Sequence, residues 1–337
     1  MRAPDFWRRA DSFGARALTP LGALYGRFAR ARLTRAAPRA AALPAIVIGG
    51  LTTGGDGKTP LALAIAARLR TLDERPALLT RGYGRRRAAG EPLLVDRDRH
   101  DAHDVGDEAL LLAREATTIV GADRAASAQM ARELGASVVV LDDGFHSRRV
   151  APDLALLAID ADYGAGNGHC LPAGPLRAPL DAQLTQADAM IIIGDGKAGE
   201  AIAREARAFG KATLAARLAP DREACGRLEG ARVMAFAGVA RPEKFLRTLK
   251  SVGAKVVETR WFADHHDYRD SELAALDAEA RRCGATLITT QKDAARIGAR
   301  ATSHEILPVE LVVDDPQALD ATLLHALERA RAQQRGT

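Results

Sequence analysis

The chain has 337 residues, which is enough for two domains, and its hydrophobic fraction of 47% supplies the apolar side chains of a full globular core. Its net charge of +5 is modestly basic, which suits an anionic partner such as a nucleotide, a phospholipid headgroup or a nucleic acid. The charge does not select a fold, so the fold and the function have to come from local patterns.

The cysteines and the apolar runs exclude several classes of protein. Cys170, Cys225 and Cys283 are widely spaced and form no paired motif, so we expect neither a disulfide framework nor a zinc site, and a reducing compartment is the default. Apolar runs such as 138–141 and 189–193 have the length of a strand and fall short of the roughly 18–20 residues that a membrane-spanning helix needs. Charges are scattered through the N-terminus, so we expect no secretory signal.

Residues 1–43 differ from the rest of the chain because their basic residues are all arginines. An apolar stripe at helical spacing is formed by Leu21, Leu24, Tyr25 and Phe28. A helix with such a stripe and an arginine-rich face can lie in the headgroup region of an anionic bilayer. The same pattern also fits a basic helix packed on its own domain. We assign this segment as a basic, amphipathic, membrane-associating helix.

From residue 43 onward, strand-like apolar runs alternate with amphipathic helical stretches. The expected strands are 44–49, 76–80, 117–120, 137–142, 154–159 and 188–193, and the helical stretches include 58–71 and 107–115. This alternation predicts an α/β fold with a doubly wound, mostly parallel sheet. We assign residues 44–220 to this first domain.

The alternation restarts after a charged passage at about 217–230. The expected strands are 231–237, 254–259, 285–290 and 306–313, separated by helical patterns at 241–252, 270–283 and 316–333. We therefore predict a second, smaller α/β domain over residues 221–337. The cleft between the two domains is the expected active site, with the second domain closing over it.

A glycine-rich loop follows the first expected strand and precedes a helix. Gly54, Gly55 and Gly57 allow the tight backbone that turns successive N–H groups onto phosphate oxygens. Lys58 can reach the β- and γ-phosphates, and the Thr59 hydroxyl can bind Mg²⁺. The segment predicted to hold the nucleotide comprises Thr52, Thr53, Gly54, Gly55, Asp56, Gly57, Lys58 and Thr59. These residues indicate a P-loop NTPase-like domain.

Three details narrow the class of P-loop protein. Thr52 stands where the usual pattern has glycine, which is compatible with the loop if its φ stays negative. Partitioning-type ATPases carry an extra lysine at the position of Thr53. Lys292 directly precedes Asp293, which is the wrong spacing for the guanine-reading motif of GTPases. ATP is therefore the expected nucleotide.

Carboxylates follow a second buried strand and open a helix. Asp142 and Asp143 come directly after the run 138–141, so they lie beside the phosphate loop in this architecture and can hold Mg²⁺. The alternative is that Asp142 caps the following turn. Asp107 and Glu108 open a helix, where they are either catalytic or simply a helix cap.

Basic and histidine-containing segments supply further candidates. The segment Arg81-Gly82-Tyr83-Gly84-Arg85-Arg86-Arg87 can clamp a phosphate through its guanidinium groups. The proline-rich stretch from Asn167 to Arg177 has the character of a loop that borders a pocket. His265 and His266 either tune a base or form a surface turn. Each of these segments also fits an ordinary surface loop.

Taken in this order, the segments resemble the tetraacyldisaccharide 4′-kinase family of lipid A biosynthesis in Gram-negative bacteria. The resemblance covers most of the chain. It rests on Pro20-Leu21…Leu24-Tyr25, Thr52-x-Gly54-Gly55-x-Gly57-Lys58-Thr59, Thr80-Arg81-Gly82-Tyr83-Gly84-Arg85, Val105-Gly106-Asp107-Glu108, Asp142-Asp143-Gly144-Phe145, Leu171-Pro172-Ala173-Gly174-Pro175-Leu176-Arg177, Phe262-x-Asp264-His265 and Thr289-Thr290-x-Lys292-Asp293. Two positions depart from the family pattern, at His146-Ser147 and at Ala178, which puts fine substrate contacts in doubt but not the activity.

The resemblance implies a kinase that transfers the γ-phosphoryl group of ATP, with Mg²⁺, to the 4′-hydroxyl of a tetraacylated glucosamine disaccharide 1-phosphate, giving lipid IVA. It implies that Asp107 is the base, paired with His265, that Lys58 is catalytic and that Glu108 acts near the metal. The implied metal ligands are Thr59, Glu108, Asp142 and Asp143, and the implied substrate contacts are Arg81, Tyr83, Asn167 and Arg177. We expect a monomeric, peripheral protein at the cytoplasmic face of the bacterial inner membrane, with no nucleic-acid partner.

Two other functions fit the loop. A nucleotide-driven switch or metallochaperone ATPase would use the same phosphate loop and hydrolyse ATP without a sugar. A basic membrane-binding or nucleic-acid-binding module would use the loop only to hold an anion, and its binding would depend steeply on salt.

Overall fold

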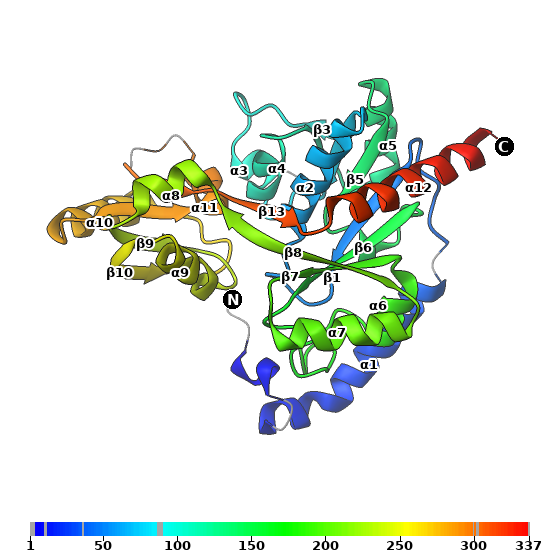
Figure 1. Cartoon of the computed structure of the whole chain (residues 1–337), viewed down its shortest axis with the longest axis horizontal. Coiled ribbons are helices and arrows are strands. Elements are labelled where there is room, and N and C mark those ends of the chain that lie inside the picture. Colours follow the sequence, from blue (N-terminus) through cyan, green and yellow to red (C-terminus); the bar gives the residue numbers. More distant parts are fainter. Residues whose placement is uncertain are drawn as a thin grey trace.

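Nine strands form one twisted sheet that runs through most of the molecule (Figure 1). This computed structural model describes residues 4–9, 12–35, 37–85, 90–298, 300 and 303–335, so Arg86 and Arg87 of the basic segment lie outside the described residues. The strands of this sheet are β1 (Ala45–Gly50), β2 (Pro76–Thr80), β3 (Leu93–Leu94), β4 (Thr117–Val120), β5 (Val138–Leu141), β6 (Leu154–Asp160), β7 (Ala189–Ile193), β8 (Ala212–Pro220) and β13 (Val309–Val313).

The strand order is β13-β8-β7-β6-β1-β5-β2-β4-β3. Only the edge pairs β3–β4 and β8–β13 are antiparallel. The inner strands β1, β5, β6 and β7 are buried along their whole length, which explains why the sequence shows them as continuous apolar runs. The predicted doubly wound, mostly parallel sheet is confirmed.

Helices cover both faces of this sheet. One face packs against α1 (Phe13–Arg35), α5 (Arg124–Glu133), α6 (Leu180–Gln186) and α7 (Lys197–Ala208), and the other packs against α2 (Lys58–Thr71), α4 (Asp107–Leu112) and α12 (Pro316–Arg335). The short helices η1 (Asp5–Arg8), α3 (Ala102–Val105) and η2 (Phe145–Ser147) lie in connecting segments. Two separate apolar cores result, one on each side of the strands.

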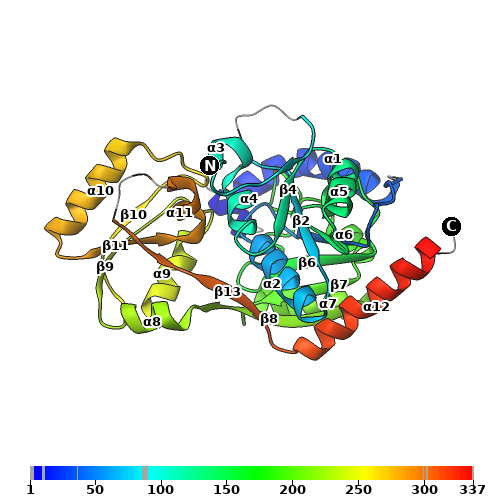
Figure 2. The same cartoon turned by 90° about the horizontal axis from the view of Figure 1, so that it is seen from above.

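A second, four-stranded parallel sheet forms the smaller domain (Figure 2). Its strands are β9 (Arg232–Ala237), β10 (Lys255–Trp261), β11 (Thr286–Thr290) and β12 (Glu305–Leu307), in the order β10-β9-β11-β12. One face packs on α8 (Arg222–Leu228) and α9 (Pro242–Ser251), and the other on α10 (Asp270–Arg282) and α11 (Gln291–Ile297).

The structure differs from the expected division of the chain near its end. The expected strand 306–313 is two strands, because Pro308 separates β12 in the second sheet from β13 in the first. Pro308 has no N–H to donate, and its carbonyl accepts a bond from Asp221 N at 3.0 Å where the chain enters the second domain. Strand β13 pairs with β8, and α12 packs on the first sheet, so the second domain is an insertion between β8 and β13.

The N-terminal helix α1 lies against the first domain with one face and leaves the other uncovered. A Cβ atom added at Gly22 would lie 2.8 Å from the Cys170 carbonyl oxygen, so glycine permits the close approach. The predicted stripe is on the opposite side, with Leu21 55% and Phe28 70% exposed. One face of this helix therefore packs on its own domain, and membrane association through the exposed stripe stays a prediction. No helix in the described ranges is both long and apolar enough to cross a membrane.

Candidate active site

The glycine-rich loop connects β1 to α2 at the centre of the large sheet. Gly54, Gly55 and Gly57 have φ values of 83°, 74° and 87°, the left-handed region that a side chain disfavours. Thr52 is not among the described residues with positive φ, and its hydroxyl donates to Asp56 Oδ1 at 2.6 Å. The second Asp56 oxygen accepts from the Thr52 N–H at 2.8 Å. Thr52 therefore stabilises the loop through its two hydrogen bonds to Asp56. Threonine at this position is a structural feature of this loop.

The loop opens onto a cavity of about 740 Å³ that both domains line. The predicted site residues that line it are Thr53, Gly54, Gly55, Asp56, Gly57, Lys58, Thr59, Arg81, Tyr83, Glu108, Asp142, Asp143, Arg177 and His265. Thr52, Asp107 and Asn167 are the predicted site residues that do not line it. Segments from both domains, as far apart in the sequence as Thr53 and His265, are thus brought to one cavity.

A hydroxyl and a buried carboxylate lie together beside the loop. Thr59 Oγ1 donates to Asp142 Oδ2 at 3.0 Å, while the buried Asp142 Oδ1 has no hydrogen-bond partner. Burial, together with the nearby charges of Glu108 and Asp143, raises the pKa of Asp142 to about 7. A carboxylate in this situation is stabilised by a cation, so these groups fit Mg²⁺.

The side chains beside the loop do not complete the coordination of Mg²⁺ by themselves. Across the part of the chain that the structure describes, no three His, Cys, Asp or Glu side chains are arranged to hold a metal ion by themselves. Mg²⁺ in nucleotide sites is commonly held by one or two carboxylates, with phosphate oxygens and water completing the octahedron. The arrangement of Thr59 and Asp142 suits an ion that arrives with a nucleotide.

Asp143 is turned toward the basic residues of the loop. Its Oδ1 accepts from Arg177 Nη1 at 2.7 Å and lies 4.0 Å from Lys58 Nζ. Burial alone would raise the pKa of Asp143, but Lys58 and Arg177 outweigh it and hold the pKa below its usual value. Arg177 also donates to the Thr52 carbonyl at 3.0 Å, which ties Asp143 to the phosphate loop.

Asp107 and His265 form a pair across the domain boundary. Asp107 Oδ2 lies 3.2 Å from His265 Nδ1, and the turn that carries His265 has a left-handed φ of 57°. The hydrogen bond to Asp107 raises the pKa of His265. Tyr83 packs its ring 5.0 Å from the imidazole. His265, which lines the cavity, stands in front of Asp107, which lies behind it.

The neighbouring His266 has a different role. Its ring stacks on Phe262 with centroids 4.6 Å apart, and its Nε2 lies 3.1 Å from Glu272 Oε2. These contacts hold His266 within the second domain. Of the two adjacent histidines, His265 is the one that lines the cavity.

Helix α11 contributes two cations that the sequence analysis did not assign to the site. Lys292 Nζ lies 2.6 Å from Glu108 Oε1, and Arg296 donates to Asp107 through Nε at 3.1 Å and also through Nη2. Burial lowers the pKa of Lys292, but the charge of Glu108 outweighs it and the pKa is raised. The only sequence signal for Lys292 was its place in the Thr-Thr-x-Lys-Asp motif, and nothing local marked Arg296.

Asn167 holds the N-terminal segment in place through hydrogen bonds. Its side-chain amide donates to the carbonyls of Phe6 at 3.2 Å and Ala173 at 2.9 Å, and its Oδ1 accepts from the His169 N–H at 3.1 Å. All of its hydrogen-bonding groups are thereby used in holding the loop. The structure does not bring it to the cavity wall.

The two departures from the family pattern are accommodated without disturbing the loop. His146 Nε2 lies 2.9 Å from Gln183 Oε1, and Gln183 Nε2 donates to the Ala178 carbonyl at 2.6 Å. Burial, with a contribution from Arg177, lowers the pKa of His146 to about 4, so this cavity residue is neutral at physiological pH. The side chain of Ala178 is fully buried.

A phosphate loop with its lysine and hydroxyl, set at the junction of two α/β domains, defines a P-loop phosphotransferase. The family model described as tetraacyldisaccharide-1-P 4′-kinase matches residues 14–328. A tetraacyldisaccharide 4′-kinase of Methylobacterium sp. is 49% identical over 98% of this chain and 99% of its own length, and one of Rhodopseudomonas palustris is 46% identical over 99% of each. The chain belongs to the tetraacyldisaccharide-1-P 4′-kinase family.

A solved structure supports the same assignment. The crystal structure of LpxK from Aquifex aeolicus in complex with ATP matches with a TM-score of 0.73 and 26% identity, covering 93% of this chain and 99% of that one. The similarity therefore extends over both domains. The resemblance seen in the sequence motifs is confirmed.

Proposed function

We propose that this protein transfers the γ-phosphoryl group of ATP to the 4′-hydroxyl of a tetraacylated glucosamine disaccharide 1-phosphate, forming the lipid A precursor lipid IVA. The observation that carries the proposal is that the phosphate loop and His265, with Asp107 behind it, come from different domains to one cavity. The family membership supplies the acceptor. The cavity supplies a place where a nucleotide and a sugar hydroxyl meet.

The nucleotide phosphates lie along the backbone of the loop. The N–H groups around Gly54, Gly55 and Gly57 face the phosphate oxygens, and Lys58 neutralises charge on the β- and γ-phosphates. Thr59 and Asp142 would hold Mg²⁺, with Glu108 and Asp143 close by in the cavity wall. When bound, the metal neutralises the charge that develops on the phosphate oxygens.

The acceptor proton passes to the Asp107–His265 pair. A sugar hydroxyl is a poor nucleophile, and a positioned base accelerates its attack by roughly 10²–10⁴. Asp107 is ionised at neutral pH, because His265 and Arg296 offset the burial that would otherwise raise its pKa. Since His265 is carried by the second domain, closing the cleft completes the pair and excludes water that would hydrolyse ATP.

The acceptor side of the cavity carries the predicted substrate contacts. Arg81, Tyr83 and Arg177 line the wall, and the ring of Tyr83 is 65% exposed. Guanidinium groups bind phosphate oxygens in a bidentate manner. We assign Arg81 and Arg177 to the anionic groups of the two substrates, and Tyr83 to the sugar.

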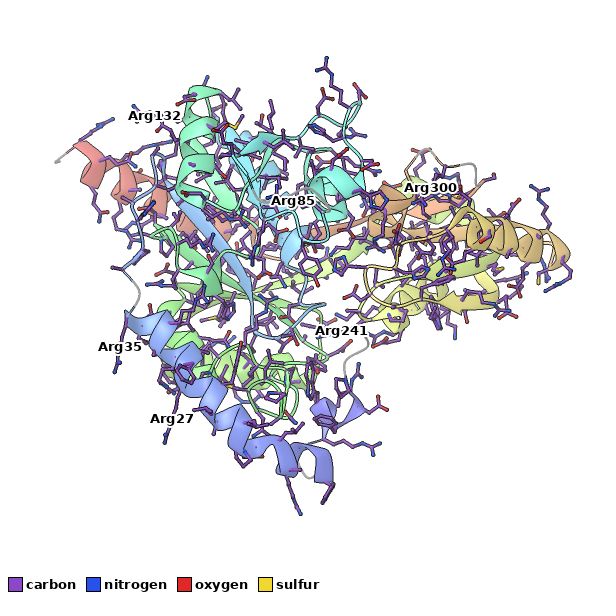
Figure 3. The ribbon with its side chains drawn as sticks, turned by 180° about the vertical axis from the view of Figure 1, so that it is seen from behind. Arg27, Arg35, Arg85, Arg132, Arg241 and Arg300 are labelled. Carbon is purple, nitrogen blue, oxygen red and sulfur yellow. The ribbon has the colours of Figure 1, made fainter. Side chains whose placement is uncertain are left out.

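Helix α1 brings the protein to its lipid substrate. The exposed stripe faces away from the first domain, and Arg27 and Arg35 lie along the same helix at the edge of the molecule (Figure 3). An apolar stripe bordered by arginines binds the headgroup region of an anionic bilayer. We place the protein as a peripheral monomer at the cytoplasmic face of the bacterial inner membrane.

The test is transfer of labelled phosphate to lipid. Purified protein is incubated with γ-labelled ATP, Mg²⁺ and the disaccharide monophosphate in detergent, and labelled lipid is the expected product. Lys58→Ala and Asp107→Ala are each expected to lower kcat by at least about 100-fold. Asp98→Asn, in an exposed loop, serves as the control. Phosphate release that is equally fast with and without the lipid, with no label in lipid, would show an ATPase instead.

A further inference from the structure

An arginine of the second domain contacts the phosphate loop. Arg241 directly precedes α9, and Figure 3 shows it where the two domains meet. Its Nη2 donates to the Gly54 carbonyl at 3.2 Å and lies 3.5 Å from Asp56 Oδ1. A Cβ atom added at Gly55 would lie 2.8 Å from Arg241 Nε, so the guanidinium packs directly on the loop backbone.

Arg241 contacts the part of the loop that surrounds the nucleotide phosphates. The segment from Gly54 to Gly57 curves around the phosphates that Lys58 binds. Arg241 and Lys58 both line the large cavity, and the Arg241 side chain is only 10% exposed. A guanidinium packed on Gly54 and Gly55 is therefore within reach of the terminal phosphate of a bound nucleotide.

The surroundings of Arg241 allow it to leave its present partner. Asp160, at the end of β6, accepts from Arg241 Nη1 and also from Lys244 Nζ at 2.6 Å. Asp160 is buried, and a buried carboxylate without a partner is costly. Because Lys244 stays when Arg241 moves, Asp160 is not left unpaired. The centroid of the Tyr163 ring lies 4.0 Å from the guanidinium carbon of Arg241 and stabilises the cation in its present position.

We propose that Arg241 is a catalytic residue that the second domain contributes in cis to phosphoryl transfer. When ATP enters the loop, the guanidinium turns from Asp160 and Asp56 to the γ-phosphoryl oxygens. This inference rests on the kinase function proposed above. Arginines placed in this way stabilise the charge of the transition state in other P-loop enzymes, where removing them lowers kcat by about 10³–10⁵.

The chemical step balances without any change at Arg241. The 4′-oxygen of the sugar forms a bond to the γ-phosphorus, and the bond from that phosphorus to the β–γ bridging oxygen breaks as ADP leaves. The hydroxyl proton goes to the Asp107–His265 pair. Arg241 donates hydrogen bonds to the transferred oxygens and keeps its own protons throughout.

The experiment compares kcat, the KM for ATP and ATP binding in a set of full-length variants. Arg241→Ala is expected to lower kcat by at least about 100-fold while changing the Kd of ATP by less than about 10-fold. Arg241→Lys keeps the charge but loses the planar fork, so its kcat is expected to lie between those of the wild type and Arg241→Ala. Added guanidinium ion is expected to restore part of the activity of Arg241→Ala, which no purely structural role predicts.

Two controls separate catalysis from domain docking. Arg247→Ala removes a surface arginine of the same helix, 62% exposed and paired with Asp162, and is expected to leave kcat unchanged. Asp160→Asn weakens docking but leaves Arg241 at the loop, and is expected to cost less than about 10-fold in kcat. Equal losses in Asp160→Asn and Arg241→Ala, or a near-wild-type kcat in Arg241→Ala, would overturn the proposal. A wild-type protein that labels no lipid would instead refute the kinase function.

Should Arg241→Ala fail to fold, Arg241→Lys and Arg241→Gln decide the matter. Lysine keeps most of the length of the arginine side chain and glutamine keeps its stem as far as the δ-carbon, and the melting temperatures of both variants are compared with that of the wild type. A folded Arg241→Gln variant with wild-type kcat contradicts the proposal as clearly as the alanine variant does.

Discussion

Arg296 is a buried cation that contacts two buried carboxylates. It donates through Nε at 3.1 Å to Asp107 Oδ2 and through Nη1 at 2.8 Å to Asp293 Oδ1. The side chains of Arg296, Asp107 and Asp293 are 7%, 4% and 0% exposed. Burial raises the pKa of Asp107, but the hydrogen bond from His265 and the charge of Arg296 outweigh it and hold the pKa well below its usual range.

Removing this arginine is expected to destabilise the protein strongly. Arg296→Ala leaves both buried carboxylates without a cation that donates to them through a guanidinium group. Asp107 keeps His265 and the Glu108 N–H, and Asp293 keeps Tyr268, Thr290 and the Gly238 N–H, so the free energy of unfolding falls by roughly 3–5 kcal/mol. Urea unfolding followed by circular dichroism measures the change. Arg282→Ala, whose side chain is 75% exposed, is the control and is expected to change stability by less than about 0.5 kcal/mol. A stability loss no larger than that of the control would show that the cluster is not a buried charge network.

The residues that the sequence revealed are those whose chemistry is local. Gly54, Gly57 and Lys58 were identifiable because the loop, its lysine and the following helix are contiguous. Arg241 and Arg296 were not, because their partners in the first domain are 81 to 189 positions away. An arginine beside a helix start or in a short helix has no local mark of such a contact. Asn167 was predicted as a substrate contact, and in this structure its side chain bonds the N-terminal segment and its own loop.

Helix α1 packs one face on its own domain and leaves an apolar stripe exposed, which we propose binds the membrane. Its buried face includes Leu33, which is 1% exposed and part of the first core, so deleting residues 1–43 would uncover that core. A sharper test changes only the exposed stripe. Leu24→Ser with Phe28→Ser is expected to weaken association with anionic vesicles by about 10-fold or more, because each apolar side chain contributes up to about 1.5–3 kcal/mol when buried.

The matched control for this prediction carries the same chemical change elsewhere. Leu134→Ser with Phe209→Ser removes two apolar side chains that are 50% and 43% exposed at the ends of α5 and α7. ATP binding is expected to be unchanged in both double variants. Equal vesicle association for the two would remove α1 as the membrane-binding element. Association is measured by vesicle co-sedimentation.

The C-terminal helix α12 is tied to the first domain by a carboxylate whose charge matters. Glu74 accepts two bonds from Arg331, at 2.8 and 2.7 Å, and one from Ser137 Oγ at 2.6 Å. Burial raises the pKa of Glu74, but the bonds from Arg331 and Ser137 outweigh it and the pKa is lowered. The charged form is therefore favoured in the folded protein relative to the unfolded chain.

The pH dependence of stability follows from the sign of that shift. A depressed pKa contributes stability above the unfolded-state value of about 4.3, and that contribution is lost as pH falls through the folded-state pKa. Glu74→Gln is expected to cost roughly 1–2 kcal/mol at pH 7 and progressively less below about pH 4. Glu115→Gln, which removes an exposed pair with Arg70 at 3.4 Å, is expected to cost less than about 0.5 kcal/mol at either pH. A loss of stability in Glu74→Gln that is the same at pH 7 and below pH 4 would contradict this prediction.

The arrangement of the whole molecule was predictable in its sheets but not in its connections. The buried strands of both domains appear in the sequence as apolar runs, and their mostly parallel arrangement follows from the alternation with helices. Strand β8 was missed because it is half exposed and carries Arg217, so it lacks an apolar run. The pairing of β13 with β8 is a contact between distant segments, and no local pattern distinguishes it from a continuation of β12.

Two lysines of the second domain hold it against the first domain in this structure. Lys244 Nζ lies 2.6 Å from Asp160 Oδ2, and Lys292 Nζ lies 2.6 Å from Glu108 Oε1. The two contacts lie at different points of the boundary between the domains, and only the strands β8 and β13 with their connections join the domains covalently (Figure 2). Together with the contacts of Arg241 and Arg296 across the same boundary, the two ion pairs favour the closed arrangement of the domains.

Removing both lysines is expected to open the molecule. Each charge-assisted hydrogen bond contributes roughly 1.5–3 kcal/mol, so losing two shifts the balance between closed and open forms by well over 10-fold. Lys244→Ala with Lys292→Ala should therefore show a larger radius of gyration in solution X-ray scattering than the wild type, without nucleotide. Lys197→Ala with Lys255→Ala, two exposed lysines, is the control. Because Lys244 and Lys292 act on the same closure, each single variant should open the molecule by less than the pair. Scattering curves that superimpose for all variants would show that packing, and not these ion pairs, holds the domains together.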